Sequence, residues 1–441
     1  MDHKKFNYKT LADFQKDLDK YKLELPLDKD VSVLKKPVTV GKKAIANRLS
    51  IQPMEGCDAL EDGSPGELTF RRYTRFAEGG AGLIWFEATA VNEDGRGQPT
   101  QLYIHQDNVD KFAELVRQTR QAGIEANNTA PYLVLQLTHA GRYGRNKVIA
   151  VHEQELDDRV GVAPNKPVIS DEALAELEDD YVRAAHLAAK AGFDAVDVKA
   201  CHRYLINELL GAHTRQGLYG GSYENRTRFI RNVIKKIKAA GIDIEVTIRL
   251  NTFDAIKYPY GWGTDKDGQI DLTEPKRFVQ ELSDLGLSMI NVTAATPYLT
   301  PHLSRPYDQP GFKGYPAPEH PLVGVCRMLN LVKEIQQTVP DCVIVGTGFS
   351  WLRQFAPYVA AGIVKSGWAA ICGFGRGGFA YPDFANDIFR HSEMLANKVC
   401  VSCSKCSELK GASRLSGCVV RDAKVYAPHY QALLKDRKGE K

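Results

Sequence analysis

The sequence predicts an α/β fold in which eight parallel strands, each followed by a helix, close into a (β/α)8 barrel with a cysteine-rich C-terminal extension. Three observations lead to this prediction: eight short apolar runs recur along the chain, amphipathic segments separate them, and four cysteines cluster after the last run. Apolar runs that are nearly continuous in Val, Ile and Leu are typical of parallel strands that helices cover. A chain of 441 residues is long enough for one such barrel with extensions.

The predicted strands, in chain order, are residues 48–54, 82–91, 132–137, 195–200, 244–250, 288–294, 342–348 and 369–375. Between them, residues 171–191, 222–240 and 274–285 show the spacing of amphipathic helices, so strand and helix alternate as they do in an all-parallel sheet. Eight such units favour closure into a TIM barrel. Periodicity alone does not count strands, and an open, doubly wound sheet is the alternative.

We expect three parts along the chain. Residues 1–47 contain an N-terminal helix and a hairpin that closes the barrel floor, residues 48–398 form the barrel and end in a helical stretch, and residues 399–441 form the cysteine-rich tail. In a barrel of this kind, the loops after the carboxyl ends of the strands carry the chemistry. Residues at the strand ends are therefore the first candidates for a functional site.

Charge and composition exclude several classes of partner. The 58 basic and 54 acidic residues leave a net charge of +4, too small an excess to favour nucleic acid. No apolar stretch has the length of a signal peptide or a membrane span, so we expect a soluble, cytoplasmic protein with no membrane partner. Five of the nine cysteines are scattered singly, as in reduced cytosolic proteins. A homo-oligomer is left open.

Two longer motifs identify a relationship. Residues 136–142 read Gln-Leu-Thr-His-Ala-Gly-Arg, and residues 219–229 read Tyr-Gly-Gly-Ser-Tyr-Glu-Asn-Arg-Thr-Arg-Phe. Both resemble signature segments of the Old Yellow Enzyme and 2,4-dienoyl-CoA reductase family of NADH:flavin oxidoreductases, which includes 2-enoate reductases. The resemblance runs from about Arg48 to the cysteine tail and so covers the barrel portion. By its residues alone, the second segment is structural: its glycines turn the chain, Ser222 caps a helix, and Glu224 lies favourably at the N-terminal end of that helix.

The resemblance implies an FMN cofactor at the barrel mouth. In the family, a Pro-Met segment lies beside the flavin ring, a glutamine binds its pyrimidine edge, and an arginine contacts N1 and O2, where its charge stabilises the reduced cofactor. Glycines after strands seven and eight would let backbone N–H groups reach phosphate oxygens, and an arginine adds a bidentate donor. The cofactor-binding residues that we expect are Pro53, Met54, Ala88, Gln136, Arg249, Gly346, Gly348, Gly375 and Arg376.

The segment after strand four supplies the candidate catalytic residues. It reads Lys-Ala-Cys-His-Arg-Tyr-Leu from residue 199 and is similar to the family's His-x-x-Asn-Gly-Tyr-Leu pattern through the shared Tyr-Leu. The resemblance makes Tyr204 the proton donor, because a phenol with an ordinary pKa of about 10 stays protonated at neutral pH. A packed core tyrosine is the alternative. His202 would hold a substrate carbonyl oxygen, and Arg203 replaces a glycine of the family.

Lys199 departs from the family, which has a histidine at this position. A lysine there would donate to the substrate oxygen together with His202. An equally weighted alternative is an internal ion pair with Asp197, two residues earlier on the same face of the strand.

The tail has the spacing of a metal centre. Its four cysteines are Cys400, Cys403, Cys406 and Cys418. Such a set suits zinc or a [4Fe-4S] cluster. The dienoyl-CoA reductase branch carries a [4Fe-4S] cluster after strand eight, usually with three residues rather than two between the second and third cysteines, so the resemblance implies the cluster; zinc or unligated thiols are the alternatives. We expect no FAD- and NAD(P)-binding domains of the kind that donate electrons in that branch, so electrons would come from NAD(P)H directly or from a separate electron-donor protein.

These observations predict an FMN-dependent oxidoreductase acting on CH–CH groups. The specific expectation is an ene-reductase that reduces the C=C bond of an α,β-unsaturated carbonyl compound, either an enone or an enoate. The alternatives are a flavin-dependent amine dehydrogenase or demethylase, a Schiff-base aldolase-type barrel that uses Lys199, and a non-enzymatic zinc module.

Overall fold

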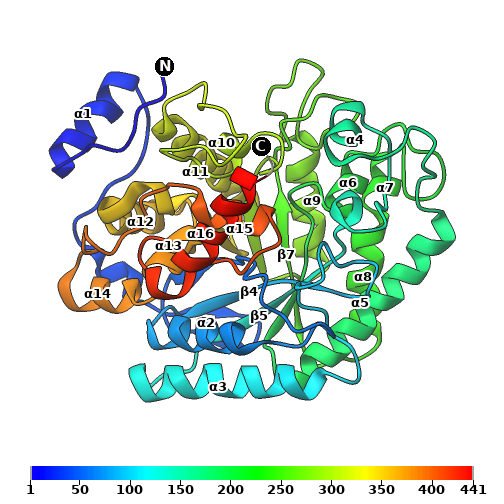
Figure 1. Ribbon diagram of the computed structural model, residues 1–441, viewed down its shortest axis with the longest axis horizontal. Coiled ribbons are helices and arrows are strands. Elements are labelled where there is room, and N and C mark those ends of the chain that lie inside the picture. The colour runs from blue at the N-terminus through cyan, green and yellow to red at the C-terminus, as the bar shows by residue number, and fades with distance from the viewer. Residues whose placement is uncertain (1, 440–441) are drawn as a thin grey trace.

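The computed structural model describes residues 2–439 and contains a closed barrel of eight parallel strands (Figure 1). Strand β10 pairs with β3, and this pairing closes the sheet, so the barrel prediction is confirmed over the open-sheet alternative. The barrel strands are β3 (Leu49–Ile51), β4 (Leu83–Ala90), β5 (Tyr132–Thr138), β6 (Ala195–Val198), β7 (Glu245–Asn251), β8 (Met289–Thr293), β9 (Val343–Gly346) and β10 (Ile371–Phe374).

Alternate residues of each strand face the barrel interior and the surrounding helices. Along β4, Leu83 and Trp85 belong to the core inside the barrel, whereas Ile84 and Phe86 pack into the larger core under the helices. All eight β4 residues are buried, since the strand is covered on both faces. This double burial is the reason that the strands appear in the sequence as continuous apolar runs.

Helices surround the barrel, and most of them follow a strand. The longer ones are α2 (Glu67–Glu78), α3 (Val109–Asn127), α5 (Asp171–Ala191), α8 (Arg228–Ala239), α9 (Thr273–Asp284), α11 (Pro321–Thr338), α12 (Ala356–Lys365) and α14 (Phe384–His391). The shorter ones are α4 (Gln154–Val160), α6 (Leu205–Leu210), α7 (Tyr223–Arg226), α10 (Pro301–Ser304) and α13 (Arg376–Ala380), with the 3-10 turns η1 (Val31–Lys35), η2 (Gly141–Tyr143) and η3 (Phe349–Phe355). None of the helices within residues 2–439 is both long and apolar enough to cross a membrane.

The helix predicted over residues 222–240 is two helices. Ser222 caps α7 by accepting a hydrogen bond from the backbone N–H of Asn225 at 3.3 Å, as the motif predicts. Helix α7 ends at Arg226, and Thr227 caps both its C-terminus and the N-terminus of α8. The Thr227 hydroxyl donates to the Tyr223 carbonyl, so a side chain satisfies a backbone group at the junction.

The N-terminal segment contributes a hairpin and a helix. Strands β1 (Val38–Val40) and β2 (Lys43–Ile45) are antiparallel, and Val40 and Ile45 pack in the same core as the interior residues of the barrel, so the hairpin closes the floor. Helix α1 (Leu11–Tyr21) lies to one side (Figure 1), where the ring of Phe14 contacts Phe355 of η3.

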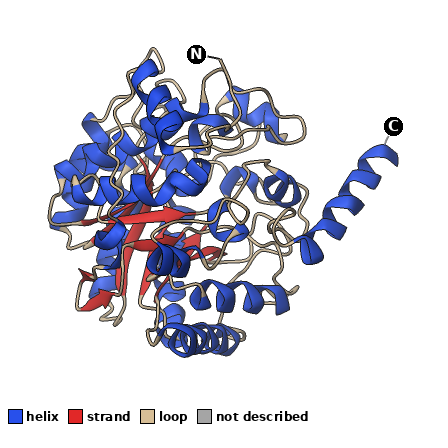
Figure 2. Cartoon of the chain, turned by 90° about the vertical axis from the view of Figure 1, so that its left-hand side faces the viewer, coloured by secondary structure: helices blue, strands red, loops and turns tan. Residues whose placement is uncertain are grey.

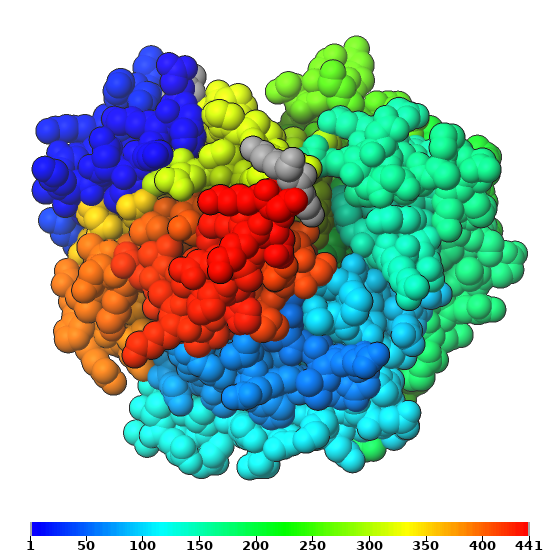
Figure 3. Space-filling model, viewed as in Figure 1, coloured from blue at the N-terminus to red at the C-terminus, as the bar shows by residue number. Residues whose placement is uncertain are grey.

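The C-terminal segment lies across the mouth side of the barrel. The segment contains the helices α15 (Lys405–Gly411) and α16 (Ala423–Gly439). Its residues, coloured orange to red, cover the face toward the viewer in Figure 3, and α16 extends away from the body in Figure 2. Asp422 accepts hydrogen bonds from Arg71 and Arg75 of α2, each at 2.7 Å. The backbone N–H of Ser416 donates to the Gly56 carbonyl at 2.7 Å. The segment is therefore attached to α2 and to the loop after β3.

Replacing Asp422 by Ala removes both ion pairs to α2 and should weaken the attachment of this segment by about 1 kcal/mol. We expect faster cleavage of the C-terminal segment in limited proteolysis, with the barrel fragment unaffected. Asp436→Ala is the matched control, because it removes an ion pair with Arg414 that is internal to the segment. Equal cleavage rates for Asp422→Ala and the unaltered chain would contradict this account.

Candidate active site

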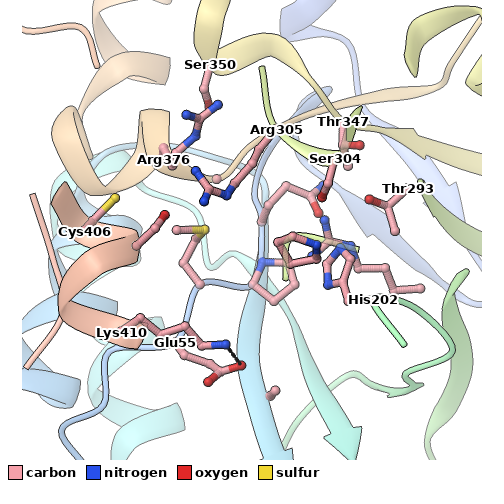
Figure 4. Close-up of a pocket in the computed structure, with 18 of the residues that line it drawn as sticks. Glu55, His202, Thr293, Ser304, Arg305, Thr347, Ser350, Arg376, Cys406 and Lys410 are labelled. Carbon is pink, nitrogen blue, oxygen red and sulfur yellow. Dashed lines mark ion pairs between the residues drawn. The ribbon is translucent and has the colours of Figure 1, made fainter. Parts of the chain in front are cut away.

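A cavity of about 270 Å³ opens at the carboxyl ends of the barrel strands (Figure 4). It contains nearly all of the residues predicted to bind a cofactor or substrate, although they come from seven different strand ends or loops. The predicted residues that line it are Pro53, Met54, Ala88, Gln136, Lys199, His202, Tyr204, Arg249, Gly348, Gly375 and Arg376.

Gly346 is the predicted residue that the structure does not bring to the cavity. A Cβ atom at this position would lie 3.2 Å from Val332 and 3.5 Å from Ala369, so the residue faces the layer of helices. Its neighbour Thr347 lines the cavity instead. Strand alternation explains the difference, because adjacent residues of β9 point to opposite faces.

A buried carboxylate lies beneath the polar side of the cavity. The Asp197 side chain accepts hydrogen bonds from the Gln136 amide at 2.6 Å, from the indole N–H of Trp85 at 2.8 Å and from the backbone N–H of Arg249 at 2.6 Å. Burial raises the pKa of Asp197 to about 6, while these three donors favour its charged form.

The predicted alternative of an ion pair between Asp197 and Lys199 is wrong. The Asp197 oxygens are already occupied by three N–H donors, and Lys199 follows the end of β6. Its Nζ atom lies 3.5 Å from the centre of the Tyr204 ring, a cation–π contact. Lys199 is 3% exposed, and burial lowers the pKa of its ammonium to about 8. The structure therefore places a readily deprotonated amine in the cavity.

The side chains of His202 and Arg203 lie in different places, only the first of them in the cavity. Both have positive φ angles, 64° and 58°, so the chain bends sharply after β6. His202 lines the cavity, and burial together with the charges of Arg249 and Lys199 lowers its pKa well below the ordinary value, so its imidazole is neutral. Arg203 is fully buried and donates to the Tyr260 carbonyl at 2.8 Å beside Asp254. Arg203, which replaces a glycine of the family, therefore adds no basic group to the cavity.

Tyr204 belongs to a network that the sequence analysis did not find. Its hydroxyl donates to Glu55 at 3.0 Å and lies 3.1 Å from the Tyr298 hydroxyl. The Lys410 ammonium of α15 lies 3.3 Å from Glu55 and 3.4 Å from the Tyr204 hydroxyl (Figure 4). Burial, followed by the charge of Glu55, raises the pKa of Tyr204 well above 10, so the phenol is protonated. Glu55 directly follows the Pro-Met motif, but nothing in the sequence indicates that Lys410 reaches it.

The end of the cavity that lies away from His202 is suited to bind an anion. Arg305 and Arg376 both line it, and neither forms an ion pair with a carboxylate within residues 2–439. Burial and the nearby charge of Arg376 lower the pKa of Arg305 to about 10. Among the described residues, the Nη1 atom of Arg376 and the Nε atom of Arg249 are buried donors without a partner. These unused donors fit a molecule with a polar ring at one end and a phosphate at the other.

The four tail cysteines surround a separate small cavity of about 20 Å³. Two of the sulfurs accept backbone hydrogen bonds: the Ser402 N–H lies 3.4 Å from Cys400, and the Arg421 N–H lies 3.3 Å from Cys418. Cys406 and Arg376 line both this cavity and the larger one. Across residues 2–439, no three His, Cys, Asp or Glu side chains come together in the arrangement of a metal-ion site.

Comparisons with known proteins agree with this geometry. Residues 33–296 match the model of the NADH:flavin oxidoreductase / NADH oxidase family. An NADPH dehydrogenase of Bacillus subtilis (strain 168) is 30% identical over 267 residues, 58% of this chain and 72% of the relative. An NADH oxidase of Thermoanaerobacter brockii is 28% identical over 83% of this chain, which spans about half of that relative, 52%. The solved complex of a 2-naphthoyl-CoA reductase with 2-naphthoyl-CoA has the same fold, with a TM-score of 0.70, 19% identity, and coverage of 88% of this chain and 57% of the other.

The closed barrel and the site at its mouth define a flavin-binding oxidoreductase barrel. The chain belongs to the NADH:flavin oxidoreductase / NADH oxidase family, whose model matches more than half of its residues. The resemblance stated from the two sequence motifs is thereby confirmed.

The lowered pKa of Lys199 generates a prediction about pH. The ammonium loses its charge as pH rises through about 8, so the affinity of the cavity for a small carboxylate such as benzoate should fall above that pH, by up to about tenfold per pH unit. Calorimetric titration from about pH 6 to about pH 10 measures the change. Lys199→Gln should bind benzoate more weakly and without this transition; an identical pH dependence in the variant would assign the effect to another group.

Proposed function

We propose that this chain is an FMN-dependent ene-reductase that reduces the C=C bond of an α,β-unsaturated carbonyl compound, an enone or an enoate. One observation carries the proposal: a protonated phenol, Tyr204, shares a cavity with the polar edge formed by Gln136 and Arg249. Ene reduction needs a hydride at the β-carbon and a proton at the α-carbon of the substrate. Bound FMN, once reduced, would supply the hydride, and the protein must supply the proton.

We propose that FMN binds to the cavity residues whose hydrogen-bond donors have no partner among residues 2–439. Gln136 and Arg249 would hold the polar edge of the ring, and Pro53, Met54 and Ala88 would lie beside it. Arg376, with the backbone at Gly348 and Gly375, would bind the phosphate, and Arg305 adds a second charge there. Gly348 has a φ of 108°, a conformation that favours glycine, and its lack of a side chain leaves the backbone accessible.

The substrate would be held by donors that lie away from the phosphate end of the cavity (Figure 4). Neutral His202 has one N–H to donate, and the Lys199 ammonium carries a charge that strengthens its hydrogen bond to a carbonyl or carboxylate oxygen. Tyr204 would give its proton to the substrate α-carbon. With three arginines assigned to the cofactor and Lys410 paired with Glu55, the Lys199 ammonium is the cation left to face the substrate, so a cationic amine substrate is disfavoured. This balance argues against the amine dehydrogenase alternative.

A second candidate function is favoured by the same lysine. An amine with its pKa lowered to about 8 is a competent nucleophile for Schiff-base formation, as in an aldolase-type barrel. The match to the flavin oxidoreductase family favours the first proposal. Trapping with borohydride in the presence of small ketones or aldehydes separates the two, because only a Schiff base adds the mass of the reduced substrate at Lys199.

We propose that the cysteine quartet holds a [4Fe-4S] cluster. The backbone N–H bonds to Cys400 and Cys418 are of the kind that stabilise cluster sulfurs, and a cluster is larger than a single ion, so its ligands lie further apart. Cys406 lines both cavities, which would bring the cluster next to the cofactor. Electrons would come from NAD(P)H, in keeping with the relatives that are an NADPH dehydrogenase and an NADH oxidase, or from a separate donor protein.

The proposal predicts that the purified protein binds FMN stoichiometrically and that Tyr204→Phe slows flavin reoxidation by an enone by about 100-fold or more, because the proton donor is lost. Stopped-flow absorbance of the oxidative half-reaction measures this rate, and reduction by NAD(P)H is followed separately. Arg376→Met, at the phosphate end, should weaken FMN binding instead. A protein that takes up no FMN, or a Tyr204→Phe variant reoxidised at the unaltered rate, would refute the assignment.

Anaerobically purified protein should contain about four iron and four sulfide per chain, with the corresponding visible absorption. Replacing Cys403 by Ser should abolish that absorption, whereas Cys326→Ser is the matched control because Cys326 is a buried cysteine of α11 outside the quartet. Zinc in place of iron would assign the quartet to a structural site, and neither metal would leave the thiols unligated.

A further inference from the structure

We propose that Lys410 is a positioning residue of the proton-donor site: it keeps Glu55 as a carboxylate, and Glu55 in turn holds the phenol of Tyr204 in place. This inference rests on the role proposed above for Tyr204. It assigns a function to the C-terminal segment that is separate from the cysteines, because Lys410 lies on α15 and reaches the mouth of the barrel.

The geometry is a closed set of short contacts. Tyr204 donates to Glu55 at 3.0 Å, and the Lys410 ammonium contacts the same Glu55 oxygen at 3.3 Å. Lys410 also donates to the Tyr298 hydroxyl, which lies 3.1 Å from that of Tyr204. Three polar groups therefore surround the phenolic oxygen. These contacts fix the position of the phenolic oxygen, which is what a proton donor in a defined pose requires.

Glu55 needs a cation to remain charged in this place. Its side chain is 12% exposed, and such burial alone would raise the pKa of a carboxyl. The charges of Lys410 and then Lys199 outweigh that effect and lower the pKa of Glu55. Burial disfavours the charge of Lys410 too, but Glu55 outweighs it and raises the pKa of Lys410.

The other ionisable groups that face Glu55 do not replace Lys410. Cys57, two residues along the chain, is buried with a raised pKa and is neutral. Glu87 on β4 is a second buried acid, paired with Arg72. Its negative charge repels that of Glu55 and so cannot stabilise the Glu55 carboxylate. Lys199 contributes a charge only until it deprotonates near pH 8. Lys410 is the cation that contacts Glu55 directly, so its loss should let the carboxyl take up a proton at neutral pH.

Lys410→Met preserves length while it removes the charge. In infrared spectra of this variant we expect one carboxylic acid stretch more than in the unaltered protein as pH falls through the neutral range, since the pKa of Glu55 rises. Asp197 and Glu87, whose pKa values burial raises to about 6 and about 7, contribute the same bands to both proteins. The rate of flavin reoxidation by an enone should fall about tenfold or more below that pKa, because protonated Glu55 is a weaker acceptor, can itself donate, and no longer fixes the phenol of Tyr204. The unaltered protein should show neither change, and Lys410→Arg, which retains the charge, should resemble it.

A second pair of variants tests the proposal even if Lys410→Met fails to fold. Glu55→Gln and Glu55→Gln/Lys410→Met leave no unpaired buried carboxylate, and both should lack the infrared band and the pH transition. Equal reoxidation rates in these two variants would show that Lys410 acts through Glu55. A slower double variant, or a Lys410→Met profile that superimposes on that of the unaltered protein, would overturn the proposal.

The outcome is distinguishable from a failure of the proposed function. If Tyr204→Phe leaves reoxidation unchanged, the ene-reductase mechanism through Tyr204 is wrong. The infrared titration of Glu55 does not depend on the substrate, so it would still report whether Lys410 holds that carboxyl in its charged form.

Discussion

The buried carboxylate of Asp197 is the interaction on which the organisation of the cavity depends. It links three barrel strands besides its own, because its donors come from Trp85 on β4, Gln136 on β5 and the backbone of Arg249 on β7. A buried charge without partners costs several kcal/mol, roughly, so its three N–H donors are what make it tolerable. The same bonds fix Gln136 and Arg249 at the polar edge, where the proposed cofactor needs them. Structural stability and the preorganisation of the site are thus served by one residue.

The cationic residues around the cavity differ in whether a carboxylate of the protein neutralises them. Arg305 and Arg376 lie at the end that suits a phosphate, and among the described residues they have no carboxylate to neutralise them. Lys410 is neutralised by Glu55, whereas Lys199 contacts the ring of Tyr204 and, among the described residues, forms no ion pair with a carboxylate. In the proposed reaction, an anionic cofactor tail would satisfy the first pair, and a substrate oxygen would satisfy Lys199. This proposed assignment of cofactor and substrate to the cations follows from which cation has a carboxylate partner among the described residues and which has none.

The sequence predicts the barrel well because each strand is buried on both faces and therefore carries an uninterrupted apolar signal. The strand-end motifs also single out Gln136 and Arg249, and both line the cavity. The sequence predicts poorly which side chains contact each other. Asp197 and Lys199 share a spacing that suits an ion pair, but the donors that occupy Asp197 come from distant strands. Arg203 leaves the cavity because two successive residues have positive φ, and no local pattern signals this. Contacts such as Tyr204 to Lys410 join residues 206 positions apart and become visible only when the chain is folded.

Helix α15 gives the C-terminal segment a direct connection to the chemistry of the barrel. It has only seven residues, and it carries both Cys406, at the wall between the two cavities, and Lys410, beside Glu55 and Tyr204. These residues are four apart, so they lie on the same face of the helix, one turn from each other. A short helix moves as a unit, and any rearrangement of the cysteines would displace the ammonium from Glu55. The integrity of the proposed cluster and the position of the proposed proton donor are therefore physically coupled, through one turn of helix and one ion pair.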